Sequence, residues 1–265
     1  MASKKVVIPI FMVLAIMSCH KDLSTKAAED PSTDTIAVNP CSILIDGVYQ
    51  YPEPDAGTID FFEYDNLPEE ICNCITTEGL VETCLNYPDW FFITFEGNGF
   101  QKGYEVLRNN FRGFKELEKR PDAANVLITK YKSTDPYGYD STWSVNQIGS
   151  LDLKLYYMTM LLGQDSLIAK ETKEEKTEII SEFLFRYNDL LVREQDSVFP
   201  LYLRGAFFTT ARMMYLDNYQ PFIAEYYDNV DLQNAIKYSG TIDNAVQKQW
   251  IISLTNDYLS TLISK

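Results

Sequence analysis

The residues best suited to chemistry gather in the central segment 135–143, outside any periodic apolar pattern: Tyr137, Tyr139, Asp140 and Trp143. Sugar recognition uses flat aromatic faces with a carboxylate nearby that accepts hydrogen bonds from sugar hydroxyls. The segment therefore predicts a ligand-binding loop. The competing interpretation is that the same side chains fold back onto neighbouring helices. A calcium site is not expected, because the Asp-x-Asp-x-Asp-Gly order is missing.

A pair of carboxylates, Glu78 and Glu82, lies four residues apart in a segment expected to be helical, so both project on one face. Glycoside hydrolases use paired carboxylates, and a carboxylate-dependent hydrolase is therefore one hypothesis. The favoured interpretation is simpler: Glu78 interacts with the helix dipole and Glu82 is solvated. No catalytic residue is assigned, and whether the chain is an enzyme stays open, with a non-catalytic role favoured.

Histidine chemistry is excluded by inventory, since His20 is the only histidine among 265 residues. Ser-His-Asp and Cys-His catalysis, histidine general bases and histidine-rich zinc sites all need a histidine in the folded domain. The sequence also lacks a nucleophile elbow and a glycine-rich phosphate loop. We therefore expect neither a metal ion nor a cofactor.

Residues 1–18 have the layout of a secretory signal peptide: two early lysines, an apolar stretch over 6–17 and a small residue at the end. The apolar stretch is shorter than the roughly 20 residues that span a bilayer. The end, Ile16-Met17-Ser18-Cys19, resembles a bacterial lipobox, which implies that Cys19 becomes the lipidated, palmitate-bearing first residue of the mature protein. A lipidated cysteine has no free thiolate, so His20 is expected to be a bystander and not half of a metal site.

Residues 19–40 carry the expected anchor and a polar, Ser/Thr-rich tether punctuated by proline. The formal net charge is −15, and removal of Lys4 and Lys5 with the leader makes it −17. Such a surface repels nucleic acid and anionic lipid headgroups, so the lipid at Cys19 should be the only link to the membrane. Because His20 stands where an aspartate is associated with inner-membrane retention, we expect the outer membrane, with the periplasmic or surface face left open.

Four cysteines remain besides the anchor: Cys41, Cys72, Cys74 and Cys84. An exported chain permits disulfides, and four cysteines allow three pairings that the sequence does not distinguish. With no usable histidine, a zinc site would need all four sulfurs. We expect one disulfide or none.

Residues 41–265 predict an all-α domain, a multi-helix bundle or an irregular stack of helix pairs, with eight to ten helices. The clearest apolar face has spacings of three and four residues and comprises Phe100, Tyr104, Leu107, Phe111, Phe114 and Leu117. Two glycines interrupt it, so it predicts one helix or two that meet near residues 109–110. Thr172 and Glu175 form a capping-box pattern that should begin a long helix. The loop near 133–143 could divide the domain into two lobes.

The segment 89–97, Asp-Trp-Phe-Phe-Ile-Thr-Phe-Glu-Gly, combines four aromatic residues between a helix-ending proline and a glycine. It is either a buried connection or an exposed apolar patch that a partner covers. Because soluble domains rarely expose such patches, we favour the buried connection.

Residues 49–88 and 99–124 resemble a pattern of uncharacterised exported proteins from Bacteroidota-type bacteria. That pattern has a Tyr-Pro loop, a proline-headed helix, a Thr-Thr helix ending in Leu-x-Tyr-Pro, and a phenylalanine- and glycine-rich helix ending in Arg-x-Asp. The matching residues are Tyr51, Pro52, Leu67, Pro68, Thr77, Leu80 to Tyr87, Pro88, Gly113, Arg120 and Asp122. The loop departs from the pattern, with Pro54-Asp55-Ala56-Gly57 in place of a direct Pro-Gly. The resemblance implies export and a helical architecture, but no activity.

These features predict a membrane-anchored, non-catalytic lipoprotein of the cell envelope whose helical domain binds a glycan, a peptide or a partner protein. Two alternatives stay open, a glycosidase-like, carboxylate-dependent hydrolase and a structural envelope protein. Two carboxyl groups that face each other in an aromatic-lined cleft would favour the hydrolase. The structural role would show neither a cleft nor a ligand.

Overall fold

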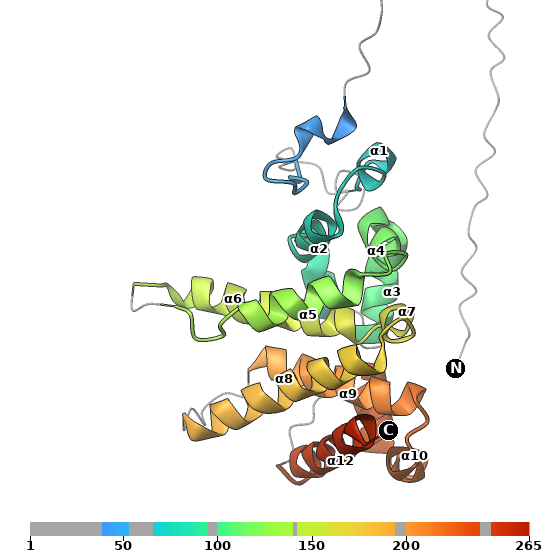
Figure 1. The fold of residues 1–265 in the computed structure, drawn as a ribbon. Coiled ribbons are helices and arrows are strands. Elements are labelled where there is room, and N and C mark those ends of the chain that lie inside the picture. Colours follow the sequence, from blue (N-terminus) through green and yellow to red (C-terminus); the bar gives the residue numbers. More distant parts are fainter. Residues whose placement is uncertain are drawn as a thin grey trace, which may run out of the picture. The chain divides into compact units, whose positions relative to one another are not determined.

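The computed structural model describes residues 39–52, 66–94, 100–139, 142–193, 200–238 and 245–264. Residues 39–265 form one compact unit (Figure 1). The expected signal peptide, Cys19 and nearly all of the tether lie outside the described residues, as does Asp140 of the central loop.

The prediction of an all-α domain is confirmed, because the described residues form twelve α-helices and two 3-10 helices and contain no β-strand. In chain order these are η1 (Pro40–Ile43), α1 (Glu69–Cys72), α2 (Thr77–Leu85), η2 (Pro88–Thr94), α3 (Phe100–Asn110), α4 (Arg112–Leu117), α5 (Ala123–Ser133), α6 (Val145–Leu162), α7 (Asp165–Ile168), α8 (Lys173–Val192), α9 (Leu201–Leu216), α10 (Gln220–Tyr226), α11 (Val230–Tyr238) and α12 (Ala245–Ile263). The helix count exceeds the expected eight to ten because a short helix such as α7 is too brief to leave an apolar period.

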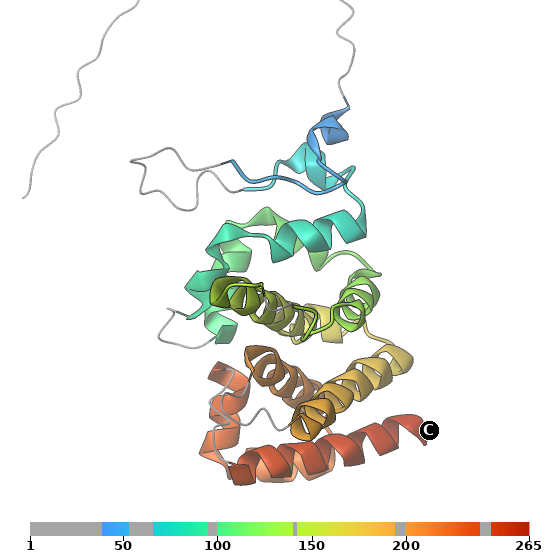
Figure 2. The same cartoon turned by 90° about the vertical axis from the view of Figure 1, so that its left-hand side faces the viewer.

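The helices lie in successive layers, which Figures 1 and 2 show from two sides. α2 contacts α4 on one side and α5 and α6 on the other, α6 packs along α9, and α8 and α9 contact α12 at the end of the stack. Each layer buries apolar side chains against the next, so one core runs through all of them. α5 and α6, on either side of the loop expected to separate two lobes, pack against each other within this one unit.

Local signals set the helix boundaries where they were predicted. Thr172 Oγ1 accepts a hydrogen bond from the Glu175 amide, and the Glu175 carboxylate accepts one from the Thr172 amide, so the predicted capping box begins α8. The predicted break in the long apolar face is also present. α3 ends at Asn110 and α4 begins at Arg112, with the fully buried Phe111 in an extended conformation between them.

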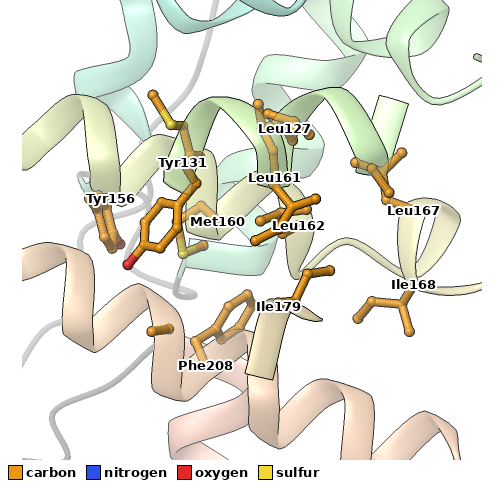
Figure 3. Packing of buried hydrophobic residues seen from close by; sticks show 14 of the residues in the cluster. Leu127, Tyr131, Tyr156, Met160, Leu161, Leu162, Leu167, Ile168, Ile179 and Phe208 are labelled. Carbon is orange, nitrogen blue, oxygen red and sulfur yellow. The ribbon is translucent and has the colours of Figure 1, made fainter. Parts of the chain in front are cut away.

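α6 and α9 approach each other closely because small residues line their contact. A Cβ added to Gly205 of α9 would lie 2.0 Å from Thr159 Oγ1 of α6, so only glycine fits there. Thr209 donates a hydrogen bond to the Thr159 carbonyl oxygen across the same contact. The apolar side chains around it include Leu127, Leu161, Leu162, Ile179 and Phe208 (Figure 3). This layer sets the spacing of the helices that carry the candidate site.

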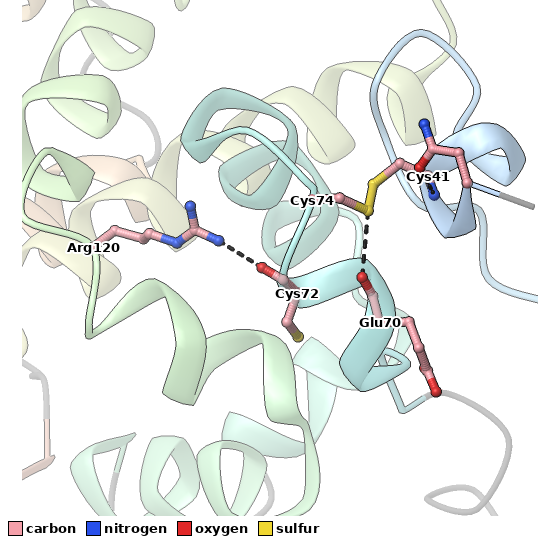
Figure 4. The surroundings of a disulfide bond; sticks show 6 residues. Cys41, Glu70, Cys72, Cys74 and Arg120 are labelled. Atoms are coloured by element: carbon pink, nitrogen blue, oxygen red, sulfur yellow. Dashed lines mark hydrogen bonds between the residues drawn. A yellow bond between two sulfur atoms is a disulfide. The ribbon is translucent and has the colours of Figure 1, made fainter. Parts of the chain in front are cut away.

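A disulfide joins Cys41 of η1 to Cys74, which follows α1, within the expectation of one disulfide or none (Figure 4). Cys72 and Cys84 are buried free thiols, and burial raises the pKa of both. The Arg120 guanidinium donates a hydrogen bond to the Cys72 carbonyl oxygen at 2.7 Å. The end of α1 is therefore tied to the start of the described chain on one side and to the turn before α5 on the other.

Residues 39–52 also pack against α2. The turn at Gly47, where φ is +78°, brings its carbonyl oxygen so close to Gly79 that a Cβ there would lie 2.2 Å from it. The Tyr51 hydroxyl donates a hydrogen bond to the Thr83 carbonyl oxygen at 2.8 Å. The disulfide thus joins a segment whose folded position is already specified by α2.

Removing the disulfide with the Cys41→Ser/Cys74→Ser pair is expected to lower the free energy of unfolding by about 2–4 kcal/mol, because the unfolded chain gains the entropy of an open loop. Urea unfolding followed by circular dichroism measures the loss. Reduction of the unaltered chain with dithiothreitol should reproduce it, whereas the double variant should not respond to reductant. Equal stability of the oxidised chain and the double variant would contradict this prediction.

Candidate functional site

The central loop between α5 and α6 carries the residues predicted to bind a ligand. The Tyr137 ring packs under the Arg193 guanidinium, whose central carbon lies 4.3 Å from the ring centroid, and the Tyr137 amide donates a hydrogen bond to Asp135 at 2.9 Å. Tyr139 and Trp143 are half-buried. Tyr137 therefore folds back onto the helices, as the competing interpretation expected.

Tyr137 lies near the buried Tyr202, which also interacts with buried side chains of two other helices. We call the group the tyrosine–arginine cluster: Tyr131 of α5, Tyr137 of the loop, Arg186 of α8 and Tyr202 of α9. The exposed fractions of its three helical members are 0, 4 and 3% in that order. The Arg186 guanidinium stacks on the Tyr131 ring at 3.9 Å and donates from Nε to the Glu182 carboxylate at 2.7 Å. Its Nη2 donates to backbone carbonyl oxygens at the end of α5. A buried charge thus holds α5 and α8 together.

Four buried polar atoms of the cluster have no hydrogen-bond partner: the hydroxyls of Tyr131, Tyr137 and Tyr202 and Nη1 of Arg186. The hydroxyls of Tyr137 and Tyr202 are near each other, and so are the Tyr131 hydroxyl and the Arg186 guanidinium, but neither pair has normal hydrogen-bond geometry. Burial raises the pKa of Tyr131 and of Tyr202, so both phenols are neutral. Figure 3 shows the Tyr131 hydroxyl pointing away from the labelled leucine side chains. Because each unpartnered buried group costs about 1–3 kcal/mol, four in one place indicate a site that a polar ligand would complete.

Two carboxylates near the cluster, among the residues that the structure describes, are already engaged. Asp152 accepts hydrogen bonds from the amides of Leu201 and Tyr202, each at 3.1 Å, and so caps the start of α9. Burial raises the pKa of Asp152 against the opposing effect of these two bonds. Glu182 is paired with Arg186. The free atoms of the cluster are therefore three phenol hydroxyls and one guanidinium N–H, which makes it a site rich in hydrogen-bond donors.

Sequence reasoning placed Tyr137 in the candidate site but missed the three helical members. One signal could have found Arg186. It continues the spacing of four, three and four residues of the buried Ile179, Phe183 and Leu190 on α8. A charge at a core position of a helix needs partners from elsewhere in the fold, and so it indicates a polar site.

A groove of about 490 Å³ lies between the turn at 46–48, α2 and α5, and both Glu78 and Glu82 line it. The expectation that Glu82 is solvated is wrong, because its carboxylate forms ion pairs with Lys130, at 2.6 Å, and with Lys154. Burial raises the pKa of Glu82, but the hydrogen bonds and charges of the two lysines outweigh it, and the pKa lies below its ordinary value. Glu82 is thus held as a carboxylate and has no proton to donate.

A second pocket, of about 510 Å³, is lined by residues that include Asp217, Tyr219 and Tyr258. Asp217 accepts hydrogen bonds from Lys176, at 2.6 Å, and from the Tyr258 hydroxyl. Glu171 is only 8% exposed, lies close enough to interact electrostatically with Asp217 and Tyr258, and has no hydrogen-bond partner on either carboxylate oxygen. Burial raises the pKa of Glu171 to about 8, against the opposing charge of Lys176. Glu171 is therefore largely protonated at neutral pH.

Within the described part of the chain, no group of three or more His, Cys, Asp or Glu side chains is arranged to hold a metal ion. None of the described helices has both the length and the apolar composition to cross a membrane. No protein-family model matches the chain, and no curated protein or solved structure is similar to it.

Proposed function

We propose that this chain is an exported lipoprotein, anchored through Cys19 in the outer membrane, whose helical domain binds a glycan at the central loop. The observation that carries the proposal is the tyrosine–arginine cluster beneath that loop, with four buried polar atoms that lack partners. Sugars present many oxygens that accept hydrogen bonds, and the half-buried Tyr139 and Trp143 supply aromatic groups on the same loop.

The Cys41–Cys74 disulfide supports export, because disulfides persist in oxidising compartments and are rare in the cytosol. The charged start, apolar stretch and lipobox-like end of residues 1–19 agree with it. A lipid on the first mature residue would hold the domain at the membrane through the tether of residues 19–40, and the acidic surface argues against a nucleic acid partner.

A carboxylate-dependent hydrolase is the second candidate, and one observation favours it. Glycosidases need one neutral carboxylic acid beside one carboxylate. Glu78 and Glu82 do not supply the acid, because two lysines hold Glu82 ionised. Glu171, with a pKa of about 8, could be the neutral acid, and the Asp217 carboxylate lies near it, yet Glu171 is only 8% exposed and so is shielded from a substrate. Binding without cleavage is the function that the geometry supports best.

A screen of residues 20–265, produced without lipid, against glycans and cell-wall fragments tests the proposal, with chromatography of every hit. We expect hits that stay intact and lose about five- to tenfold in affinity in Trp143→Ala, because an aromatic contact contributes on the order of 1 kcal/mol. Tyr227→Ala is the matched control, since that tyrosine is 67% exposed and follows α10, away from the loop in the sequence. Cleavage products would favour the hydrolase, and a screen without hits would contradict glycan binding.

A further inference from the structure

We propose that the group completing the tyrosine–arginine cluster is a neutral amide carbonyl, so that the glycan bound by this protein carries N-acetylated sugars. The inference rests on the proposed glycan binding and adds the chemical class of the ligand. It follows from three properties of the cluster: which of its atoms are free, what net charge it has, and which member is able to move.

The free atoms of the cluster call for an acceptor. Arg186 Nη1 is a donor only, and the neutral phenols of Tyr131 and Tyr202 make no hydrogen bond of normal geometry to an acceptor. The carboxylates that could have served them are engaged, Asp152 by two backbone amides and Glu182 by Arg186. A sugar hydroxyl would add a further donor, whereas a carbonyl oxygen accepts two hydrogen bonds and adds none.

The charge of the cluster argues for a neutral ligand. Glu182 compensates Arg186 through an ion pair at 2.7 Å, and the charge of Arg204 acts on Asp152. Arg193 lies at the rim, with its side chain 49% exposed, and is paired with Asp189. Each of these three arginines of the described chain thus faces a carboxylate that offsets its charge, and a net charge of −15 repels anions from the surface. The strongest neutral acceptor on a sugar is the carbonyl of an acetamido group.

Tyr137 is the member of the cluster whose side chain can move to admit a ligand. Tyr131, Arg186 and Tyr202 stand on helices, whereas Tyr137 stands on the loop. Its hydroxyl approaches Tyr202 without a normal hydrogen bond, and its ring forms a cation–π pair with the half-exposed Arg193. A ligand carbonyl that takes the place of this hydroxyl would satisfy the helical donors, while the movement of Tyr137 would break the pair with Arg193.

Isothermal titration of the mature chain with three matched oligomers tests the inference: N-acetylglucosamine tetramer, its deacetylated form and the glucose tetramer. We expect the acetylated oligomer to bind at least about tenfold more tightly than the glucose oligomer, which corresponds to one or two buried hydrogen bonds. Titration at two salt concentrations separates the general attraction of the cationic deacetylated oligomer to an acidic protein.

Tyr202→Phe gives a signature that a purely structural tyrosine would not give. Removing an unpartnered buried hydroxyl should raise the Tm of the free protein by about 2 °C while weakening the acetylated oligomer about tenfold. Tyr104→Phe is the matched control, because its buried hydroxyl is bonded to Glu118 at 2.9 Å. That variant should lose Tm and keep its affinity.

The outcomes separate this inference from the proposed function. Equal binding of glucose and acetylated oligomers, with loss of both in Tyr202→Phe, would leave the glycan site in place and overturn the acetamido assignment. A chain that binds none of the screened glycans loses the proposed function itself. A Tyr202→Phe variant with a lower Tm and unchanged affinity would make the cluster structural and overturn the inference.

Discussion

The Trp90→Ala variant is expected to lose about 3–5 kcal/mol of unfolding free energy, the range for removing a fully buried large aromatic side chain. Trp90 is 1% exposed, stacks on Tyr157 with ring centroids 4.4 Å apart and donates a hydrogen bond from Nε1 to the Cys84 carbonyl oxygen at 2.6 Å. Alanine would leave a cavity and an unpaired carbonyl in the core between α2 and α6. Equilibrium unfolding in urea, followed by far-ultraviolet circular dichroism, measures the change.

Phe185→Ala is the control for this prediction. Phe185 is an aromatic residue of α8 that is 65% exposed, and its removal should change stability by no more than about 0.5 kcal/mol. If both variants lost similar small amounts, the segment 89–97 would be an apolar patch for a partner. The burial of Trp90 and Ile93 confirms the other interpretation, a buried connection, for the described part of that segment.

The second large effect is expected from Glu171→Gln, as a change in how stability depends on pH. The pKa of Glu171 is about 8 in the folded state and 4.5 ordinarily, so the folded chain holds a proton that the unfolded chain releases. The stability contributed by the neutral carboxyl is fully present below pH 4.5 and is lost as pH rises to about 8. The loss approaches 1.4 kcal/mol per pH unit, about 3–5 kcal/mol in all. Glutamine does not ionise and removes this loss.

The measurement is the difference in unfolding free energy between Glu171→Gln and the unaltered chain at several pH values from 4.5 to 8.5. Taking the difference cancels the titration of groups that face Glu171, which include Lys176, Glu175, Asp217 and Tyr258. As pH rises, the unfolding free energy of the variant minus that of the unaltered chain should increase by about 3 kcal/mol or more. Glu174→Gln, at an exposed position of the same helix start, should give a flat difference. Parallel curves for Glu171→Gln and the unaltered chain would show that Glu171 ionises normally.

The parts of the fold that the sequence predicted depend on neighbours in the chain. The capping box of Thr172 and Glu175, which uses contacts within four residues, was predicted correctly, and the break at Phe111 agrees with one of the two alternatives, two helices that meet near residues 109–110. The all-α class followed from apolar periods in the same way. Short helices such as α7 were not predicted, because a single turn shows no apolar periodicity and is stabilised by packing with other elements.

The site was less predictable because its contacts join residues far apart in the sequence. The ion pair of Glu82 with Lys154 spans 72 residues, and the hydrogen bond from Arg186 to the Tyr131 carbonyl spans 55. The sequence around Glu82 does not indicate that Lys130 and Lys154 form ion pairs with it in the folded chain. Tyr137 was found because the loop concentrated unusual residues, whereas the cluster beneath it became visible only when α5, α8 and α9 were brought together.

The place of the disulfide has a mechanical consequence. If Cys19 is the anchor, as proposed, tension along the tether would enter the described domain at Asn39, and two residues later it would meet the covalent bond from Cys41 to Cys74. Without that bond, the pull would act in turn on single contacts such as the hydrogen bond from Tyr51 to Thr83, and it would peel residues 39–52 from α2. With the bond, the load passes directly to the junction of α1 and α2. The domain can therefore be pulled by its amino-terminal end without opening the wall of the groove that residues 46–48 form.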